Sequence, residues 1–280
     1  MSRHPQPPKR SSSAKPTSGR PAPPRADPAP TAKAEPKGSA PTPSGKEAAK
    51  AAKKAPPPGA VTAIGLSKVY GDRPALAELD MHVGYGESVA LIGHNGSGKT
   101  TFLRLAAGLL EPSDGSVLID GHPAGSLPAR AALAYLSDSP TFYEDLSVWE
   151  HLEYVARLHG HDDWEQDAAD LLDHLGLYDR ADDLPTSFSR GLRQKASIAM
   201  AFIRPFDVLV VDEPFVGLDA SGKTALMELL AEARVAGHTL LVATHELSFL
   251  ETVGRCVALR DGELLYDGTS RGIDVLSLVS

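Results

Sequence analysis

Large apolar side chains are missing from the first 58 residues of this 280-residue chain. After the initiator Met, this segment has no Val, Ile, Leu, Met, Phe, Tyr, Trp or Cys, and it holds 15 of the 23 prolines. Such a segment cannot bury apolar surface to offset the entropy lost on ordering. We therefore expect residues 1–58 to be a disordered Pro/Ala/Lys-rich tail and residues 59–280 to fold. The tail also lacks the apolar core of a secretory signal.

Cysteine and long apolar runs are scarce as well. The single cysteine, Cys256, cannot pair within the chain, which fits a reducing compartment. It lies in the apolar stretch 256–259, where a buried structural thiol is favoured over a reactive one. No apolar run approaches the roughly 18 residues that span a bilayer, so we expect the chain to be soluble on its own.

Charge divides the chain at the same boundary. The tail carries 12 Lys and Arg against 3 Asp and Glu, whereas the remainder carries 16 basic and 33 acidic residues. An acidic body argues against nucleic acid as a partner. The basic tail could contact anionic lipid at the cytoplasmic leaflet, lie on the acidic residues between 162 and 183, or remain a solvated extension. The last of these is favoured.

A glycine-rich sequence, G-H-N-G-S-G-K-T, runs from Gly93 to Thr100 and fits the pattern G-x-x-x-x-G-K-[S/T]. It follows an apolar run at 88–92, expected to be a buried strand, and precedes a helix-forming run at 101–107. In this setting the glycines let backbone N–H groups surround an anion at the positive end of the helix. Lys99 can then reach the β- and γ-phosphates of a nucleotide, and the Thr100 hydroxyl can ligate Mg²⁺.

Two carboxylates follow a second apolar run, in V-L-V-V-D-E at 208–213. At a strand end, Asp212 can hold Mg²⁺ through its water shell and Glu213 can polarise an attacking water. Farther back, F-S-R-G-L-R-Q at 188–194 precedes an Ala-rich helix expected at 194–202. Ser189 can cap that helix and, with the Gly191 backbone, offer a second anion site; an ordinary helix cap is the alternative.

Strand-like and helix-like segments alternate along the folded part. Short β-like runs surround the phosphate loop between 61 and 120, residues 127–139 form a connection, and residues 145–200 are helical. From 206 onward we expect a strand at 208–211, a helix at 221–235, a strand at 239–243 and a hairpin at Arg260-Asp261-Gly262. This alternation predicts an α/β fold with a mainly parallel sheet, interrupted by a helical insert.

Five motifs in this order resemble the nucleotide-binding subunit of ABC transporters over about residues 61–270. They are G-H-N-G-S-G-K-T, F-S-R-G-L-R-Q, V-V-D-E-P, G-L-D (217–219) and T-H-E (244–246). The resemblance implies a P-loop NTPase fold of ABC type, with an antiparallel β subdomain and a helical lobe at about 140–200. It also implies an ATPase that uses ATP and Mg²⁺ and works as a head-to-tail dimer around two ATP.

The resemblance further implies a role for each residue of the site. Glu213 would be the general base, and His245 would contact the γ-phosphate and organise the water. Tyr70 would stack on adenine, and Asp219 would lie at the dimer seam. The phosphates would be wrapped by Gly93, His94, Asn95, Gly96, Ser97, Gly98, Lys99, Thr100 and Thr101 of one subunit and by Ser189 and Gly191 of the other, with Thr100, Asp212 and Asp138 serving Mg²⁺.

Two positions depart from the family pattern. Asp138 occupies the place where the family often has Gln, at the junction between core and helical lobe. A carboxylate can still ligate Mg²⁺, but it adds negative charge beside ATP. The motif F-S-R-G-L-R-Q stands where the consensus is L-S-G-G-Q; Ser189 and Gly191 are retained, and Arg190 and Leu192 are unusual.

By this resemblance the chain drives export through a separate transmembrane permease, which would dock near residues 138–144. It would be cytoplasmic and peripheral on the inner face of the membrane, paired with an identical or a different nucleotide-binding subunit. The R-Q-K sequence at 193–195 favours export over import. The alternatives are an importer subunit, a soluble ABC-type ATPase not coupled to transport, and a binding module without turnover; intact Glu213 and His245 argue against the last.

Overall fold

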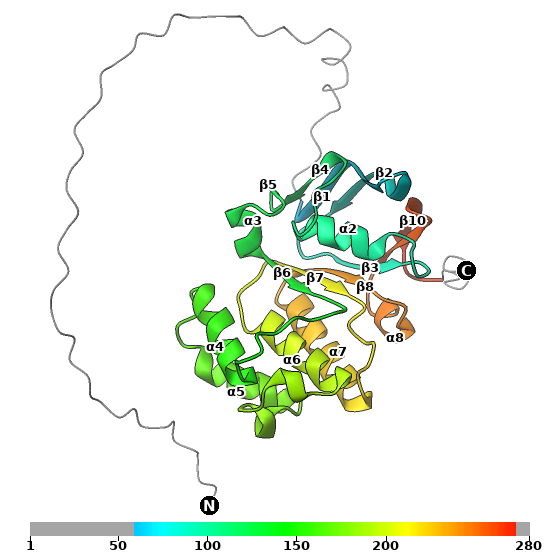
Figure 1. The fold of residues 1–280 in the computed structure, drawn as a ribbon. Coiled ribbons are helices and arrows are strands. Elements are labelled where there is room, and N and C mark those ends of the chain that lie inside the picture. Colours follow the sequence, from blue (N-terminus) through cyan, green and yellow to red (C-terminus); the bar gives the residue numbers. More distant parts are fainter. Residues whose placement is uncertain (1–58, 273–280) are drawn as a thin grey trace, which may run out of the picture. The chain divides into compact units, whose positions relative to one another are not determined.

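The computed structural model describes residues 59–272, so the expectations for the basic tail and for residues 273–280 lie outside the described residues. Two β-sheets organise this part of the chain (Figure 1). The smaller sheet is antiparallel, with the strand order β2-β1-β4-β5. Its strands are β1 (Val61–Tyr70), β2 (Arg73–Val83), β4 (Asp114–Ile119) and β5 (His122–Pro123).

The larger sheet has six strands in the order β10-β9-β3-β8-β7-β6. Neighbours from β9 to β6 pair in parallel, and β10 pairs with β9 as an antiparallel hairpin. Every residue of β3, β7 and β8 is buried, as expected for parallel strands covered on both faces. The strands are β3 (Ser88–Ile92), β6 (Leu133–Leu136), β7 (Val208–Asp212), β8 (Thr239–Ala243), β9 (Arg255–Arg260) and β10 (Glu263–Thr269).

Helices surround the larger sheet, and polar side chains cap the N-termini of several of these helices. Ser147 and Glu150 form a capping box at the start of α4, Ser189 caps α6, and Asp219 caps α7. The helices are α2 (Lys99–Ala106), α3 (Leu127–Ala132), α4 (Val148–Leu158), α5 (Trp164–His174), α6 (Arg190–Phe202), α7 (Ala220–Val235) and α8 (Leu247–Leu250), with single 3₁₀ turns η1 (Tyr178–Arg180) and η2 (Pro185–Ser187). Within the described residues, none of the helices is long and apolar enough to cross a bilayer.

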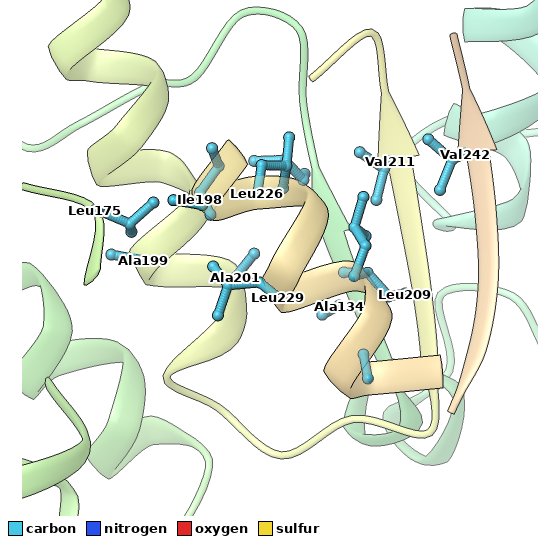
Figure 2. Packing of buried hydrophobic residues seen from close by; sticks show 14 of the residues in the cluster. Ala134, Leu175, Ile198, Ala199, Ala201, Leu209, Val211, Leu226, Leu229 and Val242 are labelled. Atoms are coloured by element: carbon cyan, nitrogen blue, oxygen red, sulfur yellow. The ribbon is translucent and has the colours of Figure 1, made fainter. Parts of the chain in front are cut away.

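Each face of the six-stranded sheet has its own apolar core, because alternate strand residues point to opposite faces. On one face, Leu91 and Val210 pack with α2 and the antiparallel sheet. On the other, Leu209, Val211 and Val242 pack against α6 and α7, as Figure 2 shows. The phosphate loop's helix is therefore enclosed between two sheets, and the α4–α7 helices cover the opposite face. This is the predicted ABC-type fold, with a mainly parallel sheet, an antiparallel sheet and a group of helices.

The segment 127–139 was expected to be a connection, and this expectation is wrong. It contains helix α3 and then β6, which pairs in parallel with β7 at the edge of the larger sheet. The strand was hard to recognise because it has four residues and no β-branched side chain, which weakens the propensity signal. Helix α6 also begins at Arg190, four residues before the expected start, because Ser189 caps it.

Candidate functional site

Four neighbouring parallel strands, β3, β8, β7 and β6, end at the same edge of the larger sheet. The phosphate loop follows β3, and T-H-E follows β8. Glu213 follows β7, and Asp138 comes two residues after β6. The carboxyl edge of a parallel sheet is where α/β proteins bind ligands. The fold thus collects at one edge four of the segments that the sequence marked as functional.

The phosphate loop between β3 and α2 depends on three glycines in the left-handed region, Gly93 (φ 151°), Gly96 (φ 86°) and Gly98 (φ 104°). A Cβ on Gly93 would lie 2.2 Å from the Leu259 carbonyl oxygen. The buried Lys99 ammonium donates to the Gly93 carbonyl oxygen at 2.6 Å and lies 3.3 Å from that of His94. The loop therefore closes around Lys99, and a side chain at Gly93 would break this arrangement.

The start of α2 is arranged to receive an anion. Its N-cap, Gly98, has no side chain to accept from the first backbone N–H groups, and its first turn has no acidic residue. Other helices, such as α4, α6 and α7, use a Ser or Asp side chain for that purpose. Helix N-termini carry partial positive charge and free N–H donors, so a phosphate group fits here.

Asp212 is fully buried at the end of β7, and neither carboxylate oxygen accepts a hydrogen bond of regular geometry. Burial raises its pKa to about 6; the nearby Thr100 hydroxyl lowers the pKa, and the Asp138 and Glu213 carboxylates raise it. A buried carboxylate that accepts no regular hydrogen bond, next to a hydroxyl, has the hard oxygen ligands that Mg²⁺ prefers. Asp212 and Thr100 therefore fit a Mg²⁺ ion, which would also balance the buried charge.

Glu213 adopts a left-handed backbone conformation (φ 45°), which is rare outside glycine and common at functional sites. Its backbone N–H donates to the Ala243 carbonyl oxygen at 2.9 Å, which fixes the turn against β8. Its Oε1 lies 3.6 Å from the Lys99 Nζ and 3.2 Å from the His245 Nδ1. The structure thus brings Lys99, Glu213 and His245 together, with His245 on the exposed side.

Asp138 lies near the same carboxylates but is partly exposed. Its Oδ1 is 3.8 Å from Arg104 Nη2 and accepts from the Ser137 hydroxyl at 3.3 Å. Arg104 also interacts with the half-buried Tyr135, which raises the pKa of Arg104. Sequence reasoning did not single out Arg104 or Tyr135. Arg104 could have been found, because it lies four residues after Thr100 on α2 and so shares its face of the helix.

The segment around Ser189 lies apart from the phosphate loop in its contacts. The Ser189 hydroxyl accepts from the Leu192 N–H at 3.4 Å, and a Cβ on Gly191 would lie 2.6 Å from the Gly217 carbonyl oxygen. Asp219 accepts from the Gly222 N–H at 2.8 Å and lies 3.2 Å from Lys195 Nζ. Among residues 59–272, no hydrogen bond or ion pair joins Ser189 or Gly191 to the phosphate loop.

Tyr70 is likewise separate from the phosphate loop in its contacts. It ends β1 and is half-exposed, with Lys68 Nζ 5.2 Å from the centre of its ring. Within the described part of the chain, no hydrogen bond joins Tyr70 to residues 93–101. An exposed aromatic face remains accessible, as stacking on a flat ring would require.

Cys256 is buried, as expected, and burial raises its pKa to about 11.

Comparison with known proteins adds to this geometry. A family model described as ABC transporter matches residues 76–216. The SkfA peptide export ATP-binding protein SkfE of Bacillus subtilis is 35% identical over 205 residues, covering 72% of this chain and 86% of that protein. The aliphatic sulfonates import ATP-binding protein SsuB of Pseudomonas putida is 34% identical over 209 residues, covering 73% of this chain and 74% of that protein.

A solved structure shows the same fold. The dimeric structure of a post-hydrolysis state of the ATP-binding cassette MJ0796, bound to ADP and Pi, is 25% identical, with a TM-score of 0.70. The alignment covers 76% of this chain and all of that one.

Proposed function

Because the chain belongs to the ABC transporter family and is an ATP-binding ATPase of that family, we propose that it drives substrate export through a separate membrane subunit. The convergence of Lys99, Asp212, Glu213 and His245 at one sheet edge supports ATP hydrolysis as the driving reaction, and the similarity to SkfE supports export. These groups suit phosphoryl transfer to water, which needs a phosphate cradle, a cation site and a base.

In the proposed reaction, the free N–H groups at the start of α2 and the Lys99 ammonium bind the β- and γ-phosphates of ATP. Thr100 and Asp212 would hold Mg²⁺, with Asp138 nearby, and the ion would supply positive charge to the phosphate oxygens. Glu213 would accept the proton of the attacking water, and His245 would orient that water and the γ-phosphate.

The second half of the site is proposed to come from another subunit. Ser189 and Gly191 make no hydrogen bond or ion pair with the phosphate loop of their own chain within residues 59–272, yet the exposed Ser189 hydroxyl sits at the start of α6. The dimeric MJ0796 structure supports a paired arrangement. ATP would then link two subunits, and hydrolysis would remove that link. The bound nucleotide would therefore set the equilibrium between paired and separated subunits.

A groove beside Asp138 is the proposed docking surface for the membrane subunit. It has a volume of about 450 Å³ and is lined by residues after β6, by η2 and by Arg190, Arg193 and Gln194 of α6. The buried His151 accepts from the Tyr143 N–H at 2.9 Å, which fixes the loop at the rim. Movement there would reach both Asp138 and α6, so docking could couple the membrane subunit to the ATP site. The chain would act at the cytoplasmic face of that membrane.

Import is the second candidate, because SsuB is almost as similar as SkfE. Purification of the full chain from its host's membranes in mild detergent, with identification of what accompanies it, tests the transport proposal. We expect a multi-span protein to be recovered. Recovery from the soluble fraction alone, without such a companion, would instead favour an ATPase not coupled to transport. Vesicles reconstituted with the recovered complex then give the direction of ATP-driven movement.

For the basic tail, residues 1–58, we favour a solvated extension, and contact with anionic lipid through its excess of 12 basic over 3 acidic residues is the alternative. Cosedimentation with vesicles of anionic and of neutral phospholipid, at low salt, measures this contact. If the tail contacts lipid, deletion of residues 2–58 should reduce binding to the anionic vesicles. Equal binding with and without the tail would rule the contact out.

A further inference from the structure

The turn between β9 and β10 lies against the phosphate loop, although no motif assigned it a function. Asp261 (φ 51°) and Gly262 (φ 84°) form this two-residue turn, and Arg260 pairs with Glu263. Positive φ at both positions is the geometry of a type I′ hairpin turn, which Asp-Gly favours. The sequence alone predicted the hairpin and gave no reason to connect it with the nucleotide.

Gly262 connects the phosphate loop with the antiparallel sheet. Its N–H donates to the Ser97 carbonyl oxygen at 3.0 Å, and its carbonyl oxygen accepts from the Ala77 N–H of β2 at 2.8 Å. The packing around it is tight: a Cβ on Gly262 would lie 3.1 Å from the Ala75 carbonyl oxygen. A Cβ on Gly98 would lie 3.4 Å from the Gly262 Cα. A side chain at position 262 would push the turn away from the loop.

The hydrogen bond to Ser97 matters because of how a phosphate loop works. Its backbone N–H groups must point inward to the anion, so carbonyl groups must point outward and find other donors. The Lys99 ammonium donates to the Gly93 carbonyl oxygen, and the Ser97 N–H donates to the His94 carbonyl oxygen. The Ser97 carbonyl oxygen, just before the start of α2, accepts from the Gly262 N–H of the β9–β10 turn.

A second contact lies beside the first. The Asp261 Oδ1 is 3.4 Å from His94 Nε2, at the other end of the same loop. Asp261 is 82% exposed, so this ion pair is weak. The turn nevertheless contacts the loop at two points, one through backbone and one through a side chain.

We propose that the Asp261–Gly262 turn is a positioning element for ATP, holding the phosphate loop in its anion-binding shape through the Ser97 carbonyl. This inference rests on the proposed assignment of residues 93–101 to the phosphates. It predicts that disturbing the turn weakens the binding of ATP and ADP while leaving the free protein folded. Gly262 itself does not touch the nucleotide.

The chain contains a matched control in the turn between β4 and β5. Asp120 (φ 48°) and Gly121 (φ 74°) form another two-residue Asp-Gly turn with Ile119 paired to His122. A Cβ on Gly121 would meet no atom within 4 Å. Gly121→Ala therefore introduces similar backbone strain away from the phosphate loop, and it separates loss of stability from loss of loop positioning.

The test compares the full chain with Gly262→Ala, Gly121→Ala and Lys99→Ala by calorimetric titration with Mg–ATP and Mg–ADP. Gly262→Ala should weaken both nucleotides by roughly three- to tenfold, the fold-change equivalent to one hydrogen bond, and Gly121→Ala by less than about twofold. Thermal unfolding without nucleotide should show a folded protein for both glycine variants, with a larger loss of stability for Gly262→Ala because its Cβ also crowds the Ala75 carbonyl. If Gly262→Ala does not fold, Gly262→Asn and Gly121→Asn replace the pair, since Asn tolerates positive φ.

The outcomes separate this inference from the proposed site. Equal nucleotide affinity in the Gly262 and Gly121 variants, with binding lost in Lys99→Ala, would overturn the role of the turn and leave the site intact. Unchanged binding in Lys99→Ala would overturn the assignment of the loop itself.

Discussion

The backbone conformation and the side-chain contacts of Glu213 both point to a role in the reaction. Its left-handed backbone is unfavourable for a residue with a side chain, and its carboxylate is held 3.2 Å from His245 Nδ1 and 3.6 Å from Lys99 Nζ. Strain of this kind persists where the surrounding structure enforces it. The conformation therefore supports a reactive role better than a structural one.

Replacement of Glu213 by Gln should retain ATP binding and slow ATP hydrolysis by about 10²-fold or more, because an amide cannot accept the proton. Steady-state phosphate release and nucleotide titration together measure this. Glu228→Gln, an exposed position on α7, is the control and should hydrolyse ATP at the normal rate. Turnover near the wild-type rate in Glu213→Gln would remove Glu213 from the role of base.

Because the pKa of Asp212 is raised, we expect the free energy of unfolding to depend on pH. Its pKa in the folded chain is raised to about 6, from 3.8, so the folded state binds this proton more tightly than the unfolded state. The protonated Asp212 carboxyl makes its full contribution to the free energy of unfolding below about pH 4. That contribution is lost as the pH rises through 6. At pH 7.5, without Mg²⁺ or nucleotide, Asp212→Asn should therefore be more stable than wild type by about 2 kcal/mol.

Chemical denaturation of both proteins at pH 7.5 and at pH 4.5 measures this difference. The advantage of Asp212→Asn should shrink at the lower pH, and the variant should lose Mg²⁺-dependent hydrolysis. A variant less stable than wild type at pH 7.5 would show that the carboxylate is not destabilised by its burial.

The residues that meet at the sheet edge could be picked out from sequence, but their surroundings could not. Gly93–Thr100 and Asp212–Glu213 stand out because their types and spacing follow from phosphate and Mg²⁺ chemistry. Arg104, Tyr135 and Gly262 contribute through contacts between distant segments, which a linear pattern does not reveal. The Asp261–Gly262 turn has the same sequence signature as the Asp120–Gly121 turn, and only the fold distinguishes them.

At the scale of elements, the helices differ in whether a side chain caps their first turn. Helix α2 starts without a side-chain cap, whereas α4 and α6 start with Ser147 and Ser189. Ser147 belongs to a complete capping box, and the Ser189 hydrogen bond is longer, at 3.4 Å. An exposed hydroxyl with a weak local bond is available to a partner's phosphate, so the two caps should respond differently to mutation.

Ser147→Ala should destabilise the fold by about 1 kcal/mol and leave ATP hydrolysis unchanged. Ser189→Ala should destabilise it less, and it should lower hydrolysis by roughly tenfold through loss of the contact to the partner's γ-phosphate. Denaturation curves and phosphate release on both variants give the comparison. The proposed role of Ser189 fails if its variant hydrolyses ATP as fast as Ser147→Ala does.

The elements themselves were predictable where the signal was long or strongly apolar. The expected strands at 88–92 and 239–243 coincide with β3 and β8, and the expected helix at 221–235 lies within α7. The four-residue edge strand β6 was missed because it is short and has no β-branched side chain, and its pairing with β7 makes it a strand. Ser189 was correctly expected as the cap of α6, but the helix was expected to start only at residue 194 because Gly191 is typical of a loop.

At the scale of the molecule, sheet topology assembles one half of the site and leaves the other half elsewhere. The order β3-β8-β7-β6 puts the phosphate loop, His245, Glu213 and Asp138 at one edge. The α6 start, with Ser189 and Gly191, packs instead on the loop at Gly217. Under the proposed function, such a chain gains a complete site by pairing with a second copy or a related subunit.

The central claim is that ATP completes the site between two subunits, and sedimentation velocity of Glu213→Gln tests it most directly. This variant should bind Mg–ATP without consuming it, so the proposed dimer should accumulate. We predict a dimer with Mg–ATP and a monomer with Mg–ADP or without nucleotide, and the same variant carrying Ser189→Ala should dimerise more weakly. A monomer that stays monomeric while saturated with Mg–ATP would contradict the account.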